Sequence, residues 1–430
     1  MENRNEHSLS LGENQTRPSV IAIIGGGAAG CFAAANIPFQ ENRSVLVFEK
    51  TGKLLQKVKV SGGGRCNATH HIFDVPALLE KYPRGKQLLK KTLYQFGPRQ
   101  TIEWFEKRGV QLKAEQDGRM FPVTDSSETI MACLREQMTK NKVEVVYNKT
   151  LLAIDKEHQG FLLRFADRST YKADKVIIAC GGYPKEEQYN WIRALGHSVQ
   201  PPVPSLFTFN LPGHSIRELM GLSVPDVSVK IMGTKISEQG PMLITHWGLS
   251  GPVILRASAW GAVVLNQKGY DFHVLVNWLD QMTREELKDR LFEIRRQAGK
   301  QLVEAKNPFG LPKRLWEFLL AEIGLAGATR WGELTSSAQN KLMDILVSHT
   351  FRVTGKTTFK EEFVTSGGIT LSEVNPETME SRIVSGLYFA GEILNADGIT
   401  GGFNFQHAWS SGWIAARAIL HSIASAGQKK

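Results

Sequence analysis

The stretch Val20-Ile-Ala-Ile-Ile-Gly-Gly-Gly-Ala-Ala-Gly30 decides the fold of this chain. Its apolar part, residues 20–24, is typical of a buried parallel strand, and Gly25, Gly27 and Gly30 form the pattern G-x-G-x-x-G where a helix should begin. The first glycine permits a tight turn, the second lets a pyrophosphate approach the backbone, and the third lets the helix pack closely on the strand. The helix N-terminus then offers unpaired N–H groups to the phosphates.

An acidic residue ends the next predicted strand. Glu49 follows Gly30 by nineteen residues and closes the apolar run 44–49. A carboxylate at this place can accept hydrogen bonds from both ribose hydroxyls, and it would repel a 2′-phosphate. Strand, glycine pattern, helix and spaced acid together predict a dinucleotide site rather than an empty Rossmann-like unit.

The length and composition indicate a globular protein with two domains. The chain has 430 residues, of which 42% are hydrophobic and 22% charged. No apolar run approaches the roughly 20 residues that cross a bilayer. Residues 1–17 are polar and predict a disordered leader rather than a signal peptide. The four cysteines lack metal-ligand or C-x-x-C spacing, so we expect reduced thiols in a cytoplasmic protein, and no metal site.

The formal net charge of +10 raises the question of a nucleic-acid partner. The basic residues are spread in mixed groups such as 81–91 and 290–300, and no RNA- or DNA-binding motif accompanies them. This pattern favours solvated helical faces, with attraction of an anionic cofactor or substrate as the next interpretation and nucleic acid as the last.

The order of strand and helix signals predicts an interrupted domain. Alternation over 20–195 indicates a parallel sheet covered by helices, and three prolines within 201–204 mark a domain crossing. Glycine-rich apolar sequence resumes near residue 356. We therefore expect a nucleotide-binding domain made of 18–199 and 356–430, with an inserted domain at 200–355. The predicted helices are 86–96, 99–108, 128–140, 283–298, 313–323 and 336–348, and the predicted strands include 143–154, 161–165, 175–182, 206–211, 226–232 and 271–278.

A second glycine cluster, Ser61-Gly-Gly-Gly-Arg-Cys-Asn67, follows the fingerprint. Three adjacent glycines let the backbone lie against a flat or phosphorylated group, and Arg65 adds a fixed cation, although a tight turn with an exposed arginine is the alternative. Lys57 could face the same site as a second cation or a proton donor. Cys66 could be a thiol of lowered pKa beside Arg65, but a small buried group is the favoured interpretation.

A third cluster lies near the C-terminus, in Gly386-Leu-Tyr-Phe-Ala-Gly-Glu392 and in the glycine-rich residues 397–412. It predicts a short buried strand that ends in a carboxylate, then a glycine loop, then an alanine-rich helix. Glu392 is placed to bond sugar-like hydroxyls. Gly401 and Gly402 stand just before the helix N-terminus, which can stabilise negative charge on a bound ring.

These motifs resemble those of the aminoacetone-oxidase-type, or bile-acid-reductase-type, family of FAD-dependent oxidoreductases. One departure is His70, where the family pattern usually carries Asn after Thr, which puts one polar contact beside the isoalloxazine in doubt. The matching segments are spread over most of 20–418 and comprise 23–30, 61–67, 118–122, 178–182, 245–252 and 387–412.

The resemblance implies an α/β fold: a glutathione-reductase-like, Rossmann-type FAD-binding domain interrupted by an inserted β-barrel-plus-helices domain over the flavin. FAD would be bound non-covalently, with its ADP half on the glycine fingerprint and Glu49. The implied cofactor-binding residues are Gly25, Gly27, Ala28, Ala29, Gly30, Glu49, Lys50, Lys57, Ser61, Gly62, Gly63, Gly64, Arg65, Cys66, Asn67, Leu151, Cys180, Gly181, Gly182, Gly391, Glu392, Gly401, Gly402, Phe403 and Asn404.

Within this set, the resemblance implies distinct places along the cofactor. Residues 65–67 would run along the flavin and its phosphates, Gly181 would sit under the pyrophosphate, and Glu392 would hold the ribityl chain. Residues 402–404 would meet the pyrimidine edge of the ring. Leu151, on a strand of the same sheet, would touch the adenine pocket, although a role in the core is the stronger interpretation.

Candidates for proton transfer are His246 and Lys57. His246 lies in the glycine-rich segment 245–251, where a histidine facing a cleft could move a proton, although fixing the turn through backbone hydrogen bonds is the favoured interpretation. His407 is expected to be structural. No cysteine pair lies near the fingerprint, which disfavours disulfide reduction. No second G-x-G-x-x-G is present, so NAD(P)H, if used, would bind transiently between the domains.

The sequence therefore predicts a cytoplasmic FAD-dependent oxidoreductase that moves hydride between a small organic substrate and the flavin, with NAD(P)H or oxygen as the other partner. The resemblance leaves an amine-oxidase reaction and NAD(P)H-driven reduction of a conjugated C=C bond open. Alternatives from other classes are a flavin-containing RNA-modifying or nucleic-acid-binding protein and a non-catalytic flavin-binding protein. We expect no membrane partner and rank nucleic acid behind a small-molecule substrate, and the oligomeric state stays open.

Overall fold

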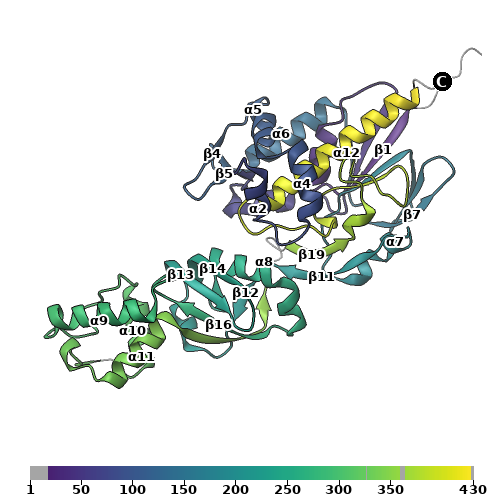
Figure 1. The fold of residues 1–430 in the computed structure, drawn as a ribbon. Helices are drawn as coiled ribbons and strands as arrows, with labels where there is room; N and C mark the ends of the chain where they lie inside the picture. The colour runs from purple at the N-terminus through teal and green to yellow at the C-terminus, as the bar shows by residue number, and fades with distance from the viewer. Residues whose placement is uncertain (1–17, 326, 359–363, 428–430) are drawn as a thin grey trace, which may run out of the picture.

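A computed structural model describes residues 18–325, 327–358 and 364–427, so the predicted leader lies outside the described residues. Figure 1 shows two lobes: a Rossmann-type domain, which contains the beginning and the end of the described chain, and an inserted domain in the green part of the sequence. Within the described ranges, no helix is long and apolar enough to cross a membrane.

A five-stranded sheet forms the centre of the Rossmann-type domain, in the order β20-β10-β1-β2-β6. All of its pairings are parallel, and β1, which carries the apolar part of the fingerprint, lies in the middle. The predicted parallel sheet is thereby confirmed. Its strands are β1 (Ser19–Ile24), β2 (Arg43–Phe48), β6 (Glu144–Val146), β10 (Lys175–Ile178) and β20 (Leu387–Phe389).

The last helix of the chain packs against the first. A side chain at Gly412 of α12 (Phe403–Gly427) would come within 2.6 Å of the carbonyl oxygen of Ala29 in α1 (Ala28–Ala35), so glycine lets the two helices approach closely. Residues from both ends of the chain share one hydrophobic core. The other elements of this domain are α2 (Gln56–Gly64), β3 (Thr69–His70), α3 (Val75–Leu79), α4 (Lys86–Gln95), α5 (Pro98–Glu106), β4 (Leu112–Ala114), β5 (Arg119–Pro122), α6 (Ser127–Lys140), β7 (Leu151–Lys156), β8 (Phe161–Phe165), β9 (Thr170–Ala173) and α7 (Asn190–Arg193).

The inserted domain is built on an antiparallel sheet of order β17-β16-β13-β14-β15-β12-β18. Its two edge strands follow each other in the chain with Gly355 between them, so the sheet curls round toward closure. Helix α8 packs on the sheet, whereas α9 to α11 form a helical group at its far end (Figure 1). The elements are β12 (Thr208–Asn210), β13 (Ser223–Ile231), β14 (Ser237–Ile244), β15 (Gly248–Ser250), α8 (Pro252–Gln267), β16 (Asp271–Asn277), α9 (Arg284–Ala298), α10 (Lys313–Glu322), α11 (Ser336–Val347), β17 (His349–Thr354) and β18 (Lys356–Thr357).

A two-stranded ribbon carries the chain between the domains. Strand β11 (Val199–Ser205) leads out, β19 (Val364–Ile369) leads back, and the two pair antiparallel. The register shifts between Gln200 and Val203, where Pro201 and Pro202 lack the N–H that a regular ladder needs. The predicted crossing at 200 thus falls inside β11, and the predicted return at 356 falls between β17 and β18 of the inserted sheet.

The single strand predicted over 143–154 is wrong. The chain forms β6 and β7 instead, and Asn148 between them adopts a left-handed conformation with a φ of 57°. Strand β7 pairs with β8 in a separate antiparallel sheet, so Leu151 is not on a strand of the parallel sheet, contrary to the prediction. Leu151 packs at the edge of the main hydrophobic core, which agrees with its stronger interpretation.

Candidate functional site

The three glycines of the fingerprint have different surroundings in the structure. Gly25 has a φ of 109°, and a side chain there would meet the backbone of Ala179. A Cβ at Gly30 would overlap the carbonyl oxygen of Gly25, so this glycine allows helix α1 to pack on the turn. At Gly27, by contrast, a Cβ would have no described atom within 4 Å. The first helical hydrogen bond runs from the N–H of Cys31 to the oxygen of Gly27 (3.0 Å), so the amides of Ala28 and Ala29 precede it.

Glu49 lies beside the fingerprint at the end of β2. Its Oε2 accepts a hydrogen bond from the N–H of Gly26 (2.8 Å), and its Oε1 accepts from both the N–H and the hydroxyl of Thr51 (2.8 Å each). The carboxylate is therefore fixed in place next to the start of α1. Lys50, which follows it, is exposed.

A second group of residues gathers where β10 and β20 end and α2 begins. Lys57 forms an ion pair with Glu392 (2.7 Å), and the other oxygen of Glu392 accepts a hydrogen bond from the N–H of Thr365 (2.8 Å). A Cβ at Gly182 would come within 2.6 Å of the Thr365 hydroxyl, and one at Gly181 would lie 3.8 Å from Glu392. That hydroxyl is buried and has no hydrogen-bond partner among the described residues. A ligand that brings hydroxyl or phosphate oxygens would complete this group.

The second glycine cluster forms a kinked end of α2. Gly62, Gly63 and Gly64 have φ values of 59°, 68° and 85°, and Cβ positions at the last two meet no described atom within 4 Å. The backbone there is open on one side, as the sequence predicts. Ser61, at the kink, donates its hydroxyl hydrogen bond to the oxygen of Val58 (3.0 Å), so its side chain caps the first part of the helix.

Arg65 and Cys66 are both held by neighbouring protein groups. The guanidinium of Arg65 pairs with Glu115 (2.6 Å) and lies over the ring of Phe121 (4.0 Å), so it is not a free cation for a phosphate. Cys66 is fully buried, and burial raises the pKa of its thiol to about 12. The alternative of a lowered thiol pKa is therefore wrong, and the small buried group is confirmed. Cys180 is half-buried, and burial raises its thiol pKa to about 11.

The third glycine cluster meets the second through Asn67. With its amide oriented to satisfy both ends, Asn67 donates to the oxygen of Thr69 (3.0 Å) and accepts from the N–H of Gly402 (3.0 Å). A Cβ at Gly402 would collide with the backbone of Thr69. Asn404 closes the loop before α12, because its side chain bonds both the N–H and the oxygen of Gly398 (2.8 and 2.9 Å). The structure thus brings residues 61–67 and 398–404 together.

Phe403 and Gly391 are held by neighbouring groups. The hydroxyl of Tyr82 donates to the oxygen of Phe403 (2.8 Å), which fixes the first residue of α12. Gly391 donates to the hydroxyl of Ser411 (2.9 Å), and its oxygen lies 3.2 Å from Nε2 of His407. His407 thus has a structural role, as expected.

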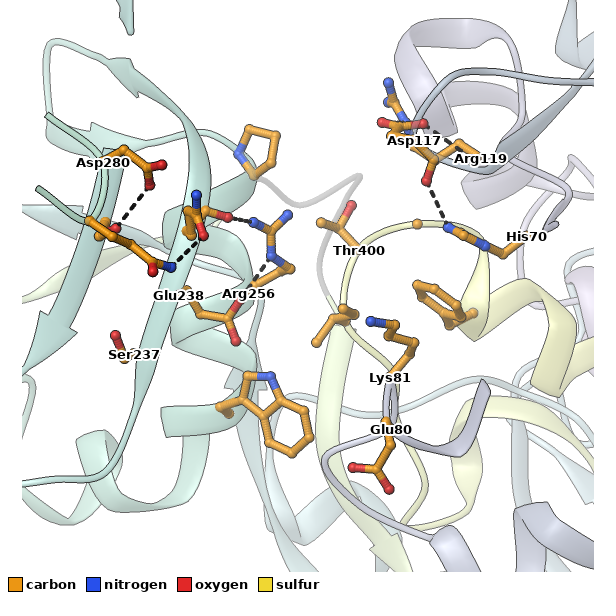
Figure 2. Close-up of a pocket in the computed structure, with 18 of the residues that line it drawn as sticks. His70, Glu80, Lys81, Asp117, Arg119, Ser237, Glu238, Arg256, Asp280 and Thr400 are labelled. Atoms are coloured by element: carbon orange, nitrogen blue, oxygen red, sulfur yellow. Dashed lines mark hydrogen bonds and ion pairs between the residues drawn. The ribbon is translucent and has the colours of Figure 1, made fainter. Parts of the chain in front are cut away.

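A cleft of about 720 Å³ opens between the two domains next to the 398–404 loop. Figure 2 shows charged and polar side chains on both of its walls, and Arg256 of the inserted domain bonded to Glu238 (2.9 Å). The Rossmann-type domain contributes His70, Glu80, Lys81, Asp117, Arg119, Ile399, Thr400, Gly401 and Phe403, and the inserted domain contributes Ser228, Ser237, Glu238, Gln239, Pro252, Arg256, Trp260, Asn277, Asp280 and Gln281.

His70 links this cleft to the start of α12. Its ring stacks on that of Phe403, with 4.8 Å between the centroids, and its Nε2 lies 3.1 Å from the oxygen of Asp117, to which it donates in the neutral form. Burial lowers the pKa of His70 below its ordinary value. The residue that departs from the family pattern is therefore a neutral, cleft-lining ring at neutral pH.

The structure does not place the two predicted proton-transfer residues in the cleft. His246 is exposed on the turn between β14 and β15, where its backbone oxygen accepts a hydrogen bond from Arg217 (2.6 Å). The cleft touches β14 at its other end, near Glu238, which is roughly 20 Å away along the strand. Lys57 pairs with Glu392 and does not line the cleft either.

Sequence reasoning missed Lys81, Arg119 and Arg256, which do line the cleft. Arg119 belongs to the segment 118–122 that carries part of the family resemblance, and Arg256 follows the matching segment 245–252. Proximity to such segments was the available signal, but it does not show that the side chains face one another.

A cluster of His214, Glu322 and His349 in the inserted domain has ligand atoms within 4.8 Å of one another, but it is unsuited to a metal. Nδ1 of His349 accepts from the indole of Trp278 (3.2 Å), and Nδ1 of His214 accepts from the N–H of Ile216 (3.1 Å). Both protons therefore belong on Nε2, and His349 uses its proton toward Glu322 (3.1 Å). A metal-bound histidine instead donates from its second ring nitrogen.

The parallel sheet, the glycine turn before α1 and the acid at the end of β2 define a nucleotide-binding Rossmann protein with an inserted antiparallel domain. Comparison with protein families agrees: residues 19–418 match the family described as "HI0933-like protein Rossmann domain". The chain belongs to this family of FAD-binding Rossmann oxidoreductases.

Relatives of known activity match this chain over nearly its whole length. A 3-dehydro-bile acid delta(4,6)-reductase of Clostridium scindens is 29% identical over 418 residues, which cover 93% of this chain and 98% of the relative. A ribosomal RNA dihydrouridine synthase of Escherichia coli is 32% identical over 412 residues, 94% of this chain and 98% of the relative. A ribosomal RNA dihydrouridine synthase of Haemophilus influenzae is 27% identical over 408 residues, 92% and 97% respectively.

Proposed function

We propose that this protein is an FAD-dependent reductase of a C=C bond conjugated with a carbonyl group, and that NAD(P)H is its reductant. The relatives support this reaction class. One is named as a delta(4,6)-reductase of a bile acid and two as dihydrouridine synthases, and dihydrouridine differs from uridine by two hydrogens across a C=C bond next to a carbonyl. Of the two reactions that the sequence left open, the relatives therefore favour reduction of a C=C bond over amine oxidation.

The residues of the site fit FAD. The open face of Gly27 and the amides at the start of α1 would receive the pyrophosphate, and Glu49 would receive the adenosine ribose. The hydroxyl of Thr365 lies next to Gly182 and Glu392 and has no partner among the described residues, and it would gain one from the ribityl or phosphate oxygens. When bound, FAD supplies a two-electron carrier between the nicotinamide and the substrate.

The chain's own contribution is the cleft. Reduction of the bond takes up one hydride and one proton, and charge develops on the carbonyl oxygen as the hydride is added. N–H donors and cations around that oxygen stabilise such charge. Lys81 supplies such a cation on the wall beside the 398–404 loop, while Arg256 and Arg119 are already held by carboxylates, Glu238 and Asp117 respectively.

The substrate that this cleft favours is a uracil base in RNA. A bile acid needs a largely apolar pocket, whereas charged and polar side chains such as Lys81, Asp117, Glu238 and Asp280 make up most of these walls (Figure 2). The polar, open cleft is the observation that carries the proposal. A small enone is the second candidate, since Trp260, Phe403 and Ile399 provide an apolar strip within the same cleft.

The test uses the purified protein reconstituted with FAD. Under anaerobic conditions we expect NADPH or NADH to bleach the flavin absorbance, and uridine-containing RNA to restore it while the RNA gains two hydrogens per reduced uridine by mass spectrometry. Recovery of colour with a steroid enone but not with RNA would select the second candidate. No bleaching by either nicotinamide, with peroxide formed from amines in air, would contradict the reductase.

A further inference from the structure

Although basic residues occur along the whole chain, their excess over acidic residues is concentrated in one segment beside the cleft. Residues 81–113 contain nine lysine and arginine residues and two acidic ones, so this segment holds seven of the ten excess positive charges of the chain. The helical part of the inserted domain, 283–348, contains eleven basic and nine acidic residues and is nearly balanced. The excess positive charge is therefore local to residues 81–113 and is not spread evenly along the chain.

Helix α4 presents this charge to solvent. Its buried side carries Leu88, Leu89, Thr92 and Leu93, which anchor the helix. On the opposite side, Lys90 and Lys91 are exposed and Tyr94 is 60% exposed. Lys86, Lys90 and Tyr94 are spaced four residues apart, so with Lys91 they form one face, which we call the α4 stripe. It is about 12 Å long.

The ion pairs of the α4 stripe leave its charge available. Lys86 pairs with Glu80 (2.9 Å) and Lys91 with Glu377 (3.2 Å), but both carboxylates are well exposed. Such surface pairs contribute little to stability, so another anion can replace the carboxylate beside either lysine. Among the residues that the structure describes, Lys90 forms no ion pair.

The α4 stripe begins at the rim of the cleft. The ammonium group of Lys86 lies over the ring of Trp260, 6.0 Å from its centroid, and Trp260 lines the cleft from the other domain. Lys81, just before α4, lines the cleft as well (Figure 2). A polyanion that sends one unit into the cleft would therefore meet these lysines immediately outside.

From this arrangement we infer that the α4 stripe binds the phosphate backbone and one flanking base of single-stranded RNA, while the cleft receives the base to be reduced. The inference rests on the proposed function and names the surface that function would need. Lysines spaced along one face match the repeat of phosphates, and the exposed ring of Tyr94 offers a base a surface to stack on. An isolated acidic metabolite would need neither the length of the stripe nor the tyrosine.

The experiment measures binding of a fluorescein-labelled oligouridylate of about 12 nucleotides to the FAD-reconstituted protein over a range of salt concentrations. We expect the double variant Lys90→Gln/Lys91→Gln to bind about tenfold more weakly at low salt, with a log–log salt slope smaller by about 0.7 for each phosphate that the variant no longer neutralises. The matched control is Lys288→Gln/Arg290→Gln, which removes two exposed charges from α9 and should bind like the wild type.

The variant Tyr94→Ala distinguishes the binding of RNA from the binding of other polyanions. We expect it to weaken oligouridylate binding about tenfold without changing the salt slope and without changing the binding of heparin, which has no bases. Equal loss with both ligands, or no loss with either, would contradict the inference that a base stacks here. Flavin bleaching by NADPH and thermal unfolding should be unchanged in every variant, which shows that the fold and the cofactor site are intact.

The two proposals fail in different ways. Oligouridylate binding that depends on Lys90, Lys91 and Tyr94 supports the stripe even if no dihydrouridine forms, and in that case the proposed reaction is wrong. Dihydrouridine formation with equal affinity in the wild type and the α4 variants supports the reaction and overturns the stripe. A wild type that binds no oligouridylate at low salt overturns the stripe as well.

Discussion

Asn67 and Gly402 are joined by a hydrogen bond of 3.0 Å between the side-chain oxygen of one and the backbone N–H of the other. This bond ties the loop after the second glycine cluster to the start of α12, two segments from opposite ends of the chain. The same amide group donates to Thr69 (3.0 Å). Asn67 therefore positions the loop at which the pyrimidine edge of a flavin is proposed to lie, with one donor and one acceptor of its amide engaged within the protein.

Asn67→Ala should loosen this junction. It leaves the N–H of Gly402 and the oxygen of Thr69 without their partner, at a cost of about 1–3 kcal/mol. We expect a lower free energy of unfolding in urea and faster release of FAD from the reconstituted protein. Asn67→Asp keeps the acceptor for Gly402 but turns a carboxylate toward the oxygen of Thr69, so it should not restore the wild-type values. Wild-type stability and FAD release in both variants would contradict the positioning role.

Gly27→Ala and Gly30→Ala should separate cofactor binding from folding. The new methyl group at residue 27 enters open space, and its φ of −85° suits alanine, so the variant should fold and yet bind FAD at least about tenfold more weakly, because the pyrophosphate approaches there. At residue 30 the methyl group meets the oxygen of Gly25, so that variant should be destabilised even without FAD. Calorimetric FAD titration and urea unfolding of the apoproteins provide the two readouts. Unimpaired FAD binding by Gly27→Ala would contradict the assigned pyrophosphate site.

Much of the fold could be predicted because its signals are local. Helix α9 begins with the reciprocal hydrogen bonds of Thr283 and Glu286 and keeps an amphipathic period, so the prediction of 283–298 is close to the observed Arg284–Ala298. Helix α8 was not predicted, because residues on several of its sides are buried and its sequence therefore lacks a clear helical period of apolar residues. The false strand over 143–154 failed at Asn148, whose left-handed backbone ends one sheet before the next begins.

The conformations of the glycines in the candidate site could be predicted for the same reason, because the neighbouring sequence indicates where the backbone needs a glycine. The cleft could not be predicted from the sequence. Lys81, Arg119 and Arg256 come from three separate segments, and only the packing of the two domains brings them to the same walls. For His246 the sequence left two roles open, because a turn rich in glycine resembles a cleft loop, and the structure places this turn on the surface of the inserted domain.

His407 should make the stability of the protein depend on pH in a defined window. Burial lowers its pKa to about 4, and its Nδ1 is buried without a hydrogen-bond partner among the described residues. As the pH falls below about 6.5, the unfolded chain takes up the proton first, so stability is fully present above that pH and falls as the pH approaches 4. This group should remove about 3 kcal/mol over the window. His407→Gln, which cannot titrate, should show a smaller decline in urea unfolding between pH 7 and 4, and an identical decline would contradict the assignment.

Arg84 should be needed to hold the domains and the 398–404 loop in register. Its guanidinium pairs with Asp397, which is fully buried, and also donates to the oxygen of Ala259 in α8 (3.0 Å). Asp397 in turn accepts a hydrogen bond from Ser205 at the end of the crossing strand β11 (3.1 Å). One ion pair thus joins the loop, the crossing ribbon and the inserted domain.

Arg84→Met should cost about 3–5 kcal/mol, because it leaves the Asp397 carboxylate buried without a partner. Burial already raises the pKa of Asp397, so this variant should lose less stability at low pH, where the carboxyl group is protonated. Adding Asp397→Asn should recover part of the loss, because it removes the uncompensated charge. The control is Arg296→Met, which breaks an exposed pair with Glu293 and should cost no more than about 1 kcal/mol. Equal costs for the two arginine variants in urea unfolding would show that the Arg84 pair does not hold the junction.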